Sequence, residues 1–546
     1  MPFPSNQSYS SICQNFRWQL PEQYNIGVDV CDRWAESEPE RIAILHKPTT
    51  GPVQPITYGQ LRRDSNRLAN LLNELDITSG DRVAVLLGQC PETASSHIAI
   101  YKMAAIAVPL FSLFERDALS YRLANCGARV VITDRSGAEK LQPIRDQLPD
   151  LMHILVIDAE GKALQTQSGW VDYEVGCAGQ SDAFTPVSTT PDTPALIIYT
   201  SGTTGQPKGA LHGHRVLLGH LPGVELSHDL LPQPDDRIWT PADWAWIGGL
   251  YDVLMPALHH GVTVVSYRAE RFDAEAALDL IESLQIRNLF MPPTALKLMR
   301  TVENIAERWS LKLRTIASGG EPLGSELLDW AKDQLGVSIN EFYGQTECNM
   351  IVSNCTAIMP AKPGSMGRPV AGHELAVIAP DGQPLPTGEV GNIAVHRPDP
   401  VMFLKYWDND QATRDRFVGD WMLTGDLAWQ DDEGYLYFQA RDDDLITSAG
   451  YRFGPGEIEN CLLGHDAVKM AAVVGIADPV RTQIVKAFII LQEGVEPSDQ
   501  LVEALQQRVK SRLAAHEYPR QIEFVNELPM TTTGKIIRRQ LRQNQE

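Results

Sequence analysis

Cysteine is scarce in this chain of 546 residues, and the eight cysteines follow no regular spacing. A disulfide scaffold needs a higher density of cysteine, and a zinc site needs ligands only a few residues apart. Cys348 and Cys355 enclose six residues, and no histidines cluster near them. We therefore expect no zinc site, and reduced thiols in a cytoplasmic protein.

Long apolar runs are also missing. The most apolar long window, residues 97–111, is interrupted by Lys102 and is too short to cross a bilayer. The first residues lack the basic start and the apolar core of a secretory leader, and the last residues match no peroxisomal address. We expect no membrane span and no export signal.

Basic residues are outnumbered: 47 lysines and arginines face 69 aspartates and glutamates, which gives a net charge of −22. Such a surface repels nucleic acid and anionic lipid head groups, so we expect neither as a partner. A polyanionic ligand must instead meet a local group of hydrogen-bond donors. The composition, 43% hydrophobic and 21% charged, excludes disorder, and the length predicts several folded units.

Apolar, β-branched runs alternate with segments of helical period through most of the chain. The apolar runs are residues 83–87, 130–133, 195–199, 262–266 and 288–291. Helical segments at residues 92–104, 273–285 and 294–306 follow the first, fourth and fifth of these runs. This alternation is typical of an α/β fold with largely parallel, buried strands.

The pattern changes twice towards the C-terminus. Short alternating strands with turn signals over residues 363–440 predict a small β-rich, mainly antiparallel unit. A compact α+β pattern follows the acidic cluster at residues 442–444. Its expected elements are helix 455–463, strands 468–475 and 485–491, helix 498–514 and strand 521–526. We therefore divide the chain into a large α/β domain, residues 1–442, and a small α+β domain, residues 443–546.

The sharpest local pattern is YTSGTTGQPKG at residues 199–209, after a buried apolar strand. Such a concentration of glycine and hydroxyl residues can wrap phosphate oxygens with N–H and O–H donors. It is not a Walker loop, because Lys208 follows proline and precedes glycine. We expect phosphate contacts from Thr200, Ser201, Gly202, Thr203, Thr204, Gly205 and Lys208. A flexible surface turn is the alternative.

This loop resembles the phosphate-binding signature of the adenylate-forming superfamily, which comprises acyl-CoA synthetases, luciferases and peptide-synthetase adenylation domains. Further segments follow in that family's order: SGGEP at 318–322, EFYGQTE at 341–347, TGD at 424–426, ARDDDLITSAGYRFGPGEIE at 440–459 and PMTTTGK at 529–535. FRWQLPEQYNIGVDVCDRW at 16–34 resembles the acetyl-CoA and medium-chain acyl-CoA synthetase branch. The resemblance implies that a carboxylic acid and MgATP form an acyl-adenylate and pyrophosphate, and that CoA then displaces AMP to form acyl-CoA.

The resemblance assigns several of these segments to the nucleotide. The residues implied to line the adenine are Gly320, Glu321, Pro322, Glu341 and Phe342, and Tyr343, Gly344 and Gln345 are implied to bind the nucleotide as well. Asp426 would accept hydrogen bonds from the ribose hydroxyls, and Arg441 would donate to ribose or phosphate. Thr346 would lie beside phosphate, and Glu347 would be the ligand of a Mg²⁺ ion that bridges phosphates. Taken alone, these residues are equally typical of turns, strand ends and surfaces.

Lys535 is the catalytic residue that the resemblance implies. The matching lysine bridges the substrate carboxylate and the α-phosphate and stabilises charge as the carboxylate attacks phosphorus, an effect worth about 3–4 kcal/mol. No general base is needed, because a carboxylate is already ionised at pH 7. Acylation would neutralise the amine and act as an off switch, which would make a lysine acyltransferase or deacylase a partner.

The second half-reaction implies a mobile small domain, because Lys535 must leave before CoA reaches the adenylate. Asp443 matches the family's hinge aspartate. The CoA contacts implied for the rotated form are Ala449, Gly450, Tyr451, Arg481 and Tyr518. The last two are equally typical of solvated surface side chains. Arg452 would contact ATP phosphates in the first conformation.

The predicted acyl pocket combines Gly344 with the segment ADWAWIGGLYD at 242–252. The acetate-specific relatives carry tryptophan at the position of Gly344, so glycine is expected to leave the pocket open. Trp246, Ile247 and Gly248 would line it, although Trp246 is also typical of core packing. These features predict a medium-chain, branched or aryl acid longer than propionate, since each buried methylene contributes about 0.8 kcal/mol.

Other activities have a weaker basis in the residues. Adenylation of an amino acid would need a buried acid for its ammonium group, for which Asp243 is the nearby carboxylate, and usually a carrier domain. A luciferase-type oxygenase fits the branch poorly. A non-enzymatic nucleotide sensor would be expected to lack Lys535 or Glu347, and a kinase would release ADP. We therefore predict an AMP-forming acyl-CoA synthetase that uses Mg²⁺, ATP and CoA.

Overall fold

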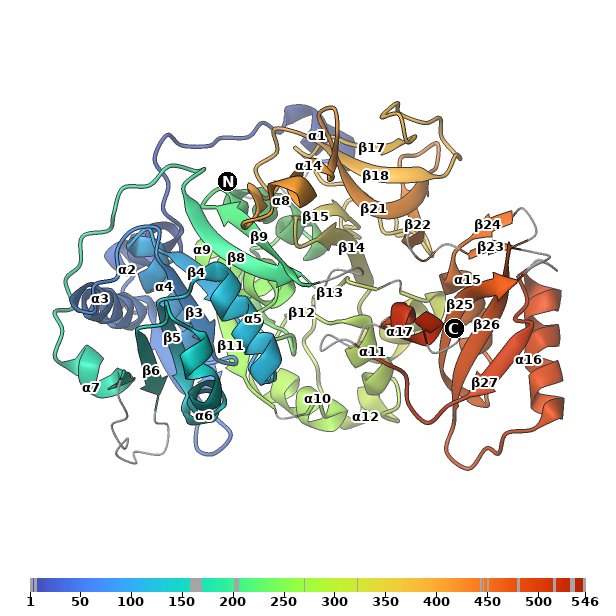
Figure 1. Cartoon of the computed structure of the whole chain (residues 1–546), viewed down its shortest axis with the longest axis horizontal. Coiled ribbons are helices and arrows are strands. Elements are labelled where there is room, and N and C mark those ends of the chain that lie inside the picture. The colour runs from blue at the N-terminus through green and yellow to red at the C-terminus, as the bar shows by residue number, and fades with distance from the viewer. Residues whose placement is uncertain are drawn as a thin grey trace.

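A large body and a smaller C-terminal unit lie side by side in the computed structural model (Figure 1). The structure describes residues 3, 7–157, 169–200, 206–269, 271–321, 323–441, 444, 446–448, 451–478, 482–513, 517–530 and 536–543. The architecture is mixed α/β, which confirms the fold class predicted from the alternating sequence pattern.

The first sheet of the large body has the strand order β19-β9-β8-β4-β3-β5-β6-β7. Its strands are β3 (Arg82–Leu86), β4 (Ile106–Pro109), β5 (Val130–Asp134), β6 (His153–Ile157), β7 (Trp170–Asp172), β8 (Pro194–Thr200), β9 (Lys208–Gly213) and β19 (Lys405–Tyr406). The strands from β8 to β7 are parallel. All but the edge strand β7 are almost fully buried, because both faces of the sheet are covered. β8 and β9 form an antiparallel hairpin.

The second sheet has the order β16-β15-β14-β13-β12-β10-β11-β1-β2. Its strands are β1 (Ile42–Lys47), β2 (Gln54–Thr57), β10 (Arg237–Trp239), β11 (Thr263–Tyr267), β12 (Asn288–Phe290), β13 (Thr315–Ser318), β14 (Ile339–Gln345), β15 (Cys348–Ser353) and β16 (Arg368–Pro369). The strands from β1 to β14 are parallel, and the remaining pairs at both edges are antiparallel.

Helices separate and cover these sheets. They are α1 (Tyr9–Asn15), η1 (Val28–Asp32), α2 (Arg33–Ser37), α3 (Tyr58–Glu74), α4 (Pro91–Lys102), α5 (Arg116–Cys126), α6 (Arg135–Leu141), η2 (Gln142–Gln147), α7 (Tyr173–Ala178), α8 (Val216–Ser227), η3 (Gly248–Leu254), α9 (Met255–His260), α10 (Ala274–Ser283), α11 (Pro293–Met299), α12 (Ile305–Arg308), α13 (Ser325–Trp330) and η4 (Ala331–Leu335). One apolar core joins Leu68 of α3 and Ile98 of α4 to Val83 and Val264 in the two sheets. None of the described helices is long and apolar enough to span a membrane.

One expected helix has the wrong extent. The predicted segment 294–306 is two helices, because α11 ends at Met299 and α12 begins at Ile305. Asn304 between them has a φ of 56°, a left-handed conformation that asparagine tolerates better than most residues and that interrupts a helix.

The β-rich part is a five-stranded antiparallel sheet, as the alternating pattern predicts. Its elements are β17 (Leu375–Ile378), β18 (Gly391–His396), α14 (Asp410–Arg414), β20 (Phe417–Val418), β21 (Trp421–Gln430) and β22 (Leu436–Arg441). The register of β21 and β22 makes Asp426 and Arg441 direct neighbours. Two polar residues of the predicted nucleotide site therefore meet at one edge of this sheet.

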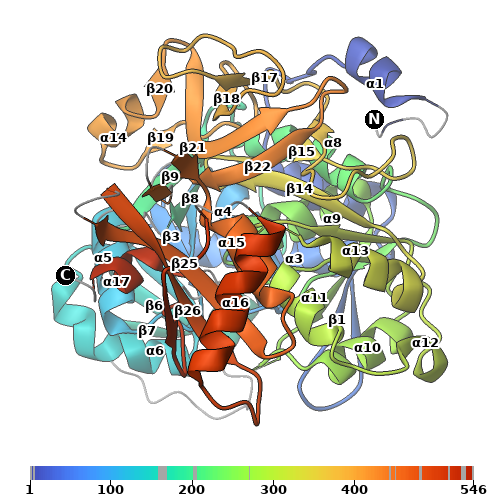
Figure 2. The same ribbon diagram turned by 90° about the vertical axis from the view of Figure 1, so that its right-hand side faces the viewer.

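The C-terminal unit is α+β and contains each element expected from the sequence. It comprises β23 (Ile446–Ser448), β24 (Tyr451–Phe453), α15 (Pro455–Leu463), β25 (Val468–Asp478), β26 (Thr482–Leu491), α16 (Asp499–Arg512), β27 (Gln521–Phe524) and α17 (Arg538–Gln543). Ile458, Val473, Val485 and Leu505 belong to its separate apolar core. Figures 1 and 2 show the unit against one side of the large body, and α17 lies on the face turned towards that body in Figure 1.

Candidate active site

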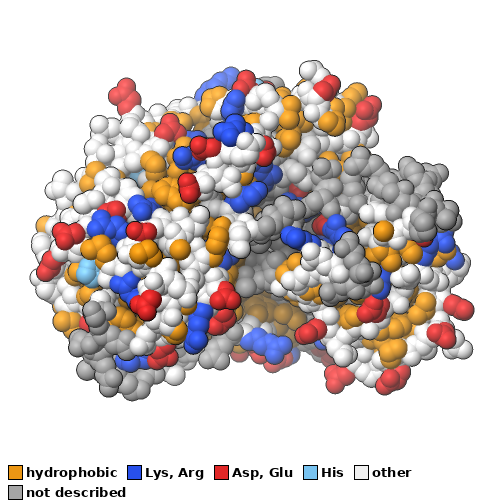
Figure 3. Space-filling model, in the orientation of Figure 1, with side chains coloured by type: hydrophobic (Ala, Val, Ile, Leu, Met, Phe, Trp, Pro, Cys, Tyr) orange, Lys and Arg blue, Asp and Glu red, His pale blue; other side chains and the backbone are white. Residues whose placement is uncertain are grey.

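A cleft of about 3500 Å³ lies between the large body and the C-terminal unit, where Figure 3 shows the surface hollowed. The predicted site residues that line it are Thr200, Lys208, Trp246, Ile247, Gly248, Gly320, Glu321, Glu341, Phe342, Tyr343, Gly344, Gln345, Thr346, Glu347, Asp426 and Arg441. Arg538 and Arg542 of α17 line it from the C-terminal unit. The fold thus gathers segments that lie far apart in the sequence.

Other predicted residues cannot be placed in the cleft. Ser201, Gly202, Thr203, Thr204, Gly205, Pro322, Asp443, Ala449, Gly450, Arg481 and Lys535 lie outside the described residues, as do the side chains of Tyr451 and Arg452. The two ends of the predicted phosphate loop are described: Thr200 and Lys208 are register partners in the β8–β9 hairpin. Tyr518 does not line the cleft, and its ring packs against Lys510 and Arg520 in the C-terminal unit.

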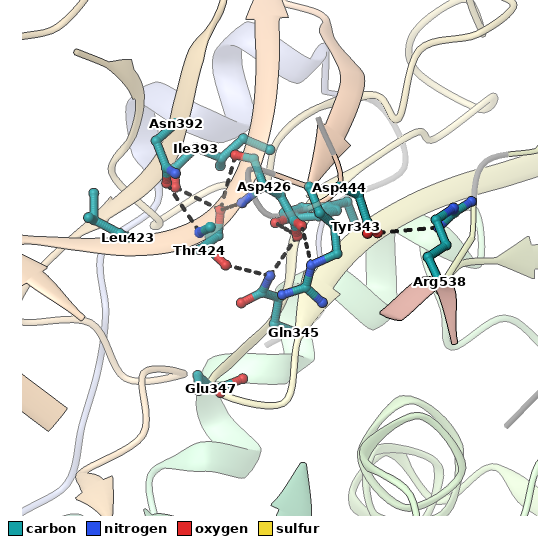
Figure 4. A network of polar contacts seen from close by, with 12 residues as sticks. Tyr343, Gln345, Glu347, Asn392, Ile393, Leu423, Thr424, Asp426, Asp444 and Arg538 are labelled. Atoms are coloured by element: carbon teal, nitrogen blue, oxygen red, sulfur yellow. Dashed lines mark hydrogen bonds and ion pairs between the residues drawn. The ribbon is translucent and has the colours of Figure 1, made fainter. Parts of the chain in front are cut away.

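Asp426 is the centre of a polar network on the large body (Figure 4). The Tyr343 hydroxyl donates a hydrogen bond to Asp426 Oδ2 at 2.6 Å, and Gln345 Nε2 donates to the same oxygen at 2.5 Å. Arg441 Nε lies 3.6 Å from Asp426 Oδ1. Burial and the adjacent Asp426 carboxylate raise the pKa of Tyr343 well above its ordinary value, so its hydroxyl remains a donor. The network holds one carboxylate in a defined position at the cleft wall.

Glu347 has two partners that the sequence motifs did not indicate. Arg416 Nη2 lies 3.1 Å from Glu347 Oε1, and the Tyr406 hydroxyl donates to the same oxygen. Arg416 Nε also donates to the Tyr406 hydroxyl at 2.9 Å. Glu347 is only 4% exposed. A carboxylate this buried must be paired to stay ionised, and Arg416 supplies the opposite charge.

The second oxygen of Glu347, Oε2, has no hydrogen-bond partner among the described residues and belongs to a side chain that lines the cleft. A hard carboxylate oxygen of this kind fits Mg²⁺, which typically takes one or two carboxylates and fills its other positions with phosphate oxygens and water. The described part of the chain contains no group of three or more acidic, histidine or cysteine side chains that could hold a metal ion.

Glu341 lies deeper in the same wall, beside the predicted adenine segment. Its Oε1 accepts a hydrogen bond from the backbone N–H of Leu323 at 3.3 Å. Burial raises its pKa to about 8, and this single hydrogen bond opposes the rise. The ring of the adjacent Phe342 lies 5.4 Å from that of Phe290. This end of the cleft therefore offers an apolar ring surface and a carboxyl group that is mainly neutral at pH 7.

The part of the cleft that holds the residues predicted to form the acyl pocket is aromatic. The ring of Trp246 lies 5.6 Å from that of Phe111 and 6.0 Å from that of Phe114. Ile247, Gly248 and Phe290 line the neighbouring surface. Asp243 also lines the cleft, where its Oδ1 accepts the Ala245 backbone N–H at 2.8 Å and burial raises its pKa to about 6.

The expected effect of Gly344 on pocket size is wrong in one respect. A Cβ atom on Gly344 would lie 2.3 Å from the backbone nitrogen of Met350 and 2.6 Å from Asn349 Oδ1. The space that a side chain would occupy is therefore filled by β15 rather than left open. Gly344 lines the cleft, but its lack of a side chain makes room for Asn349.

Sequence reasoning also missed Asp252 and Asn349, which line the cleft and form a hydrogen bond of 2.6 Å. A signal was present for Asp252, because it is the acidic residue in the otherwise apolar run GGLYDVLMPAL.

On the opposite wall, Arg538 pairs with Glu459 at 2.7 Å and with Asp444 at 3.3 Å, and Arg542 also pairs with Asp444. These pairs fix α17 on the C-terminal unit.

The AMP-binding enzyme family model matches residues 31–407, and the model of the AMP-binding enzyme C-terminal domain matches residues 457–535. An acetyl-coenzyme A synthetase of Bacillus subtilis is 35% identical over 95% of this chain and 90% of its own length. The mitochondrial acyl-coenzyme A synthetase ACSM3 of Mus musculus is 32% identical over 99% and 94%.

Among solved structures, the anthranilate CoA ligase AuaEII in complex with anthranoyl-AMP superposes with a TM-score of 0.87 at 30% identity, over 96% of this chain and 98% of that one. The family models, the relatives and the fold agree over nearly the whole length. The chain therefore belongs to the AMP-binding enzyme family and is an acyl-CoA synthetase, an AMP-forming acid–thiol ligase that activates a carboxylic acid with ATP.

Proposed function

We propose that this acyl-CoA synthetase acts on a carboxylic acid longer than propionate, of the medium-chain, branched or aryl class. The observation that carries the proposal is the aromatic enclosure at the acyl side of the cleft, where Trp246 packs against Phe111 and Phe114. Apolar walls of this kind favour substrates that bury carbon surface. The similarity to the ligase solved with anthranoyl-AMP supports an aryl acid. We expect this chain to act on a larger acid than the similar acetyl-coenzyme A synthetase does.

In the first half-reaction, a carboxylate oxygen attacks the α-phosphorus of ATP, and the bond from that phosphorus to the bridging oxygen breaks to release pyrophosphate. We assign the ribose hydroxyls to Asp426, which Tyr343 and Gln345 hold in place. Glu347 would hold Mg²⁺ through its cleft-facing carboxylate, and the ion would neutralise phosphate charge. Lys535 would bridge the substrate carboxylate and the α-phosphate.

In the second half-reaction, the CoA sulfur attacks the carbonyl carbon, the carbon–oxygen bond to AMP breaks, and the thiol proton passes to solvent. We assign Asp443 as the hinge of the small domain. Rotation about this hinge would move α17 and Lys535 out of the cleft and bring in the segment around Ala449, Gly450 and Tyr451. The position of α17 at the cleft supports placing this structure in the first conformation. Acylation of Lys535 by an acyltransferase, reversed by a deacylase, would stop adenylation because it removes the positive charge.

We also place the reaction in the cytoplasm. All eight cysteines are free, and none pairs with another. Burial raises the pKa of five of them, so their thiols are protonated at pH 7; they are Cys31, Cys90, Cys126, Cys177 and Cys355. Thiols kept in this form suit a reducing compartment.

The test is CoA-dependent release of AMP and pyrophosphate from MgATP, measured across acids from acetate to decanoate, with benzoate, branched acids and amino acids included. We expect the highest kcat/KM with a medium-chain, branched or aryl acid. A maximum at acetate or propionate would overturn the proposed acid class. Pyrophosphate exchange that proceeds with no thioester product in the presence of CoA would overturn the assignment of CoA as acceptor.

A further inference from the structure

Asp252 is a buried carboxyl group at the acyl side of the cleft. It lies in η3, a π-helical segment, and is 2% exposed. Its neighbours Leu250, Tyr251, Val253 and Leu254 are all fully buried. Burial of a carboxyl group in such surroundings is costly unless a partner compensates, and π-helical turns frequently occur at functional sites. Its presence therefore calls for a partner or a ligand.

The partner within the chain is Asn349, whose Nδ2 donates to Asp252 Oδ1 at 2.6 Å. The ladder between β14 and β15 is irregular at this point, because Tyr343 pairs with Val352 but Gln345 pairs with Cys348. Met350, inside the irregularity, has a φ of 54°. A bulge of this kind re-aims side chains, and here Asn349 reaches η3 across the sheet edge.

The pair has unused hydrogen-bonding capacity. Asp252 Oδ2 and Asn349 Oδ1 accept no hydrogen bond from any residue in the described ranges. Both side chains line the cleft, and a Cβ atom on Gly248 would lie 3.4 Å from Asp252 Oδ2. Oδ2 is therefore beside the same glycine that borders the acyl surface. Asp252 is 2% and Asn349 is 5% exposed, so little solvent reaches these two oxygens, and a donor on a ligand in the cleft can bind them.

Burial raises the pKa of Asp252 well above its ordinary value, and the Asn349 hydrogen bond opposes the rise. A neutral carboxyl group can accept and donate, and an ammonium group beside it would favour its ionised form. An all-carbon acyl chain would leave both oxygens unsatisfied. An acid that carries a hydrogen-bond donor would satisfy them.

We propose that Asp252 and Asn349 form a recognition pair for a hydroxyl or amino group on the acyl part of the acid. The inference rests on the proposed function and narrows its substrate class to acids that carry such a donor away from the reacting carboxylate. Asn349 Oδ1 is an acceptor, and Asp252 Oδ2 accepts when the carboxyl group is ionised, so a hydroxyl or amino group on the substrate can donate to both oxygens. Sites built to bind a substrate hydroxyl or amine discriminate strongly against the analogue that lacks it.

The experiment compares acids that share one carbon skeleton and differ only in the donor. Benzoate is paired with hydroxybenzoates and aminobenzoates, and hexanoate with 6-hydroxyhexanoate and 6-aminohexanoate. The readout is kcat/KM for CoA-dependent AMP release by the full-length enzyme. We expect at least one donor-bearing acid to exceed its plain parent by about tenfold or more. Plain parents equal to or better than all their derivatives would overturn the inference.

Two variants identify the residue and the donor. Asp252→Leu should bring the ratio of kcat/KM for the donor-bearing acid to that for the plain parent down to about one. Circular dichroism of the variant is the control for folding. Asp252→Asn keeps an acceptor oxygen, so it should preserve a preference for a hydroxyl and reduce a preference for an ammonium group. An equal loss with both acids of a pair would mean that Asp252 only supports the fold, and would overturn the inference.

The outcomes separate this inference from the proposed function. If the wild-type enzyme activates hexanoate and benzoate as well as their derivatives, the proposed function stands and the recognition pair is overturned. An enzyme that prefers acetate to every larger acid loses the proposed acid class itself. If Asp252→Leu does not fold, the comparison of matched acids with the wild-type enzyme still decides the question.

Discussion

Arg416 and Glu347 form an ion pair of 3.1 Å on the wall of the nucleotide cleft, and both contact the hydroxyl of Tyr406. The pair supplies an opposite charge to a carboxylate that is almost fully buried. It also leaves one carboxylate oxygen, Oε2, for a ligand.

Replacement of Glu347 by glutamine should raise the Mg²⁺ concentration needed for half-maximal pyrophosphate exchange by about tenfold or more, because the anionic ligand is lost. Tyr406→Phe removes the hydroxyl but keeps the Arg416–Glu347 pair, so its shift should be smaller. Titration of pyrophosphate exchange with Mg²⁺ at fixed ATP measures both. Equal shifts in the two variants would contradict the assignment of Glu347 as the metal ligand.

Gly344→Ala should lower the free energy of unfolding by about 1–3 kcal/mol, because the added methyl group meets the backbone of Met350 at 2.3 Å. Gly456→Ala is the matched control: a Cβ atom there meets no atom within 4 Å, and alanine favours the helix. Denaturant unfolding of the two variants provides the measurement. If Gly344→Ala were as stable as the wild type, the close packing of β14 on β15 would be refuted. By the same reasoning, Gly344→Trp should disrupt this edge rather than only shorten the acyl pocket.

Glu341 should make stability depend on pH. Its pKa of about 8 in the folded protein exceeds the ordinary value of about 4.5, so between these values the folded state binds a proton that the unfolded state has lost. The contribution of this residue to stability therefore falls as the pH rises through that window, by up to about 1.4 kcal/mol per pH unit.

Glu341→Gln removes this dependence, so the variant should gain stability relative to the wild type between pH 5.5 and 7.5. Denaturation at several pH values measures the difference. The exposed Glu303 provides the control, since Glu303→Gln should show a constant difference across the same range. A constant difference for Glu341→Gln as well would show that Glu341 is ionised in the folded protein.

Lys535→Ala should slow adenylation by about a hundredfold or more but leave thioester formation from supplied acyl-AMP within about tenfold of the wild type. The physical reason is that the ammonium group acts on charge that develops only in the first half-reaction. Lys312→Ala is the control, because Lys312 is exposed and does not line the cleft. An equal loss in both half-reactions would contradict the account of two conformations.

Much of the site could be predicted because its parts are short, contiguous motifs. Thr200 ends β8, Glu347 follows β14 and Asp426 lies within β21, each in a recognisable motif, and the fold brings them to one cleft. Both boundaries of α15 and the first residue of β25 also agree with the prediction from the sequence pattern, whereas β25 continues three residues beyond its predicted end.

The remainder depends on contacts that no local pattern encodes. Arg416 reaches Glu347 from a segment 69 residues away, and Asn349 reaches Asp252 across 97 residues. The volume at Gly344 was misjudged because residue type shows that a side chain is missing but not which neighbour fills the space. That neighbour, Asn349, is placed by an irregular strand register, which depends on tertiary packing.

The most direct test of the adenylate route follows oxygen from the acid. With the carboxylate labelled by ¹⁸O, attack on the α-phosphorus and cleavage by CoA at the carbonyl carbon must leave a single labelled oxygen in AMP. We predict AMP that carries one ¹⁸O and pyrophosphate that carries none, read by mass spectrometry after one turnover with the best acid. Unlabelled AMP, or ADP as the nucleotide product, would contradict the account.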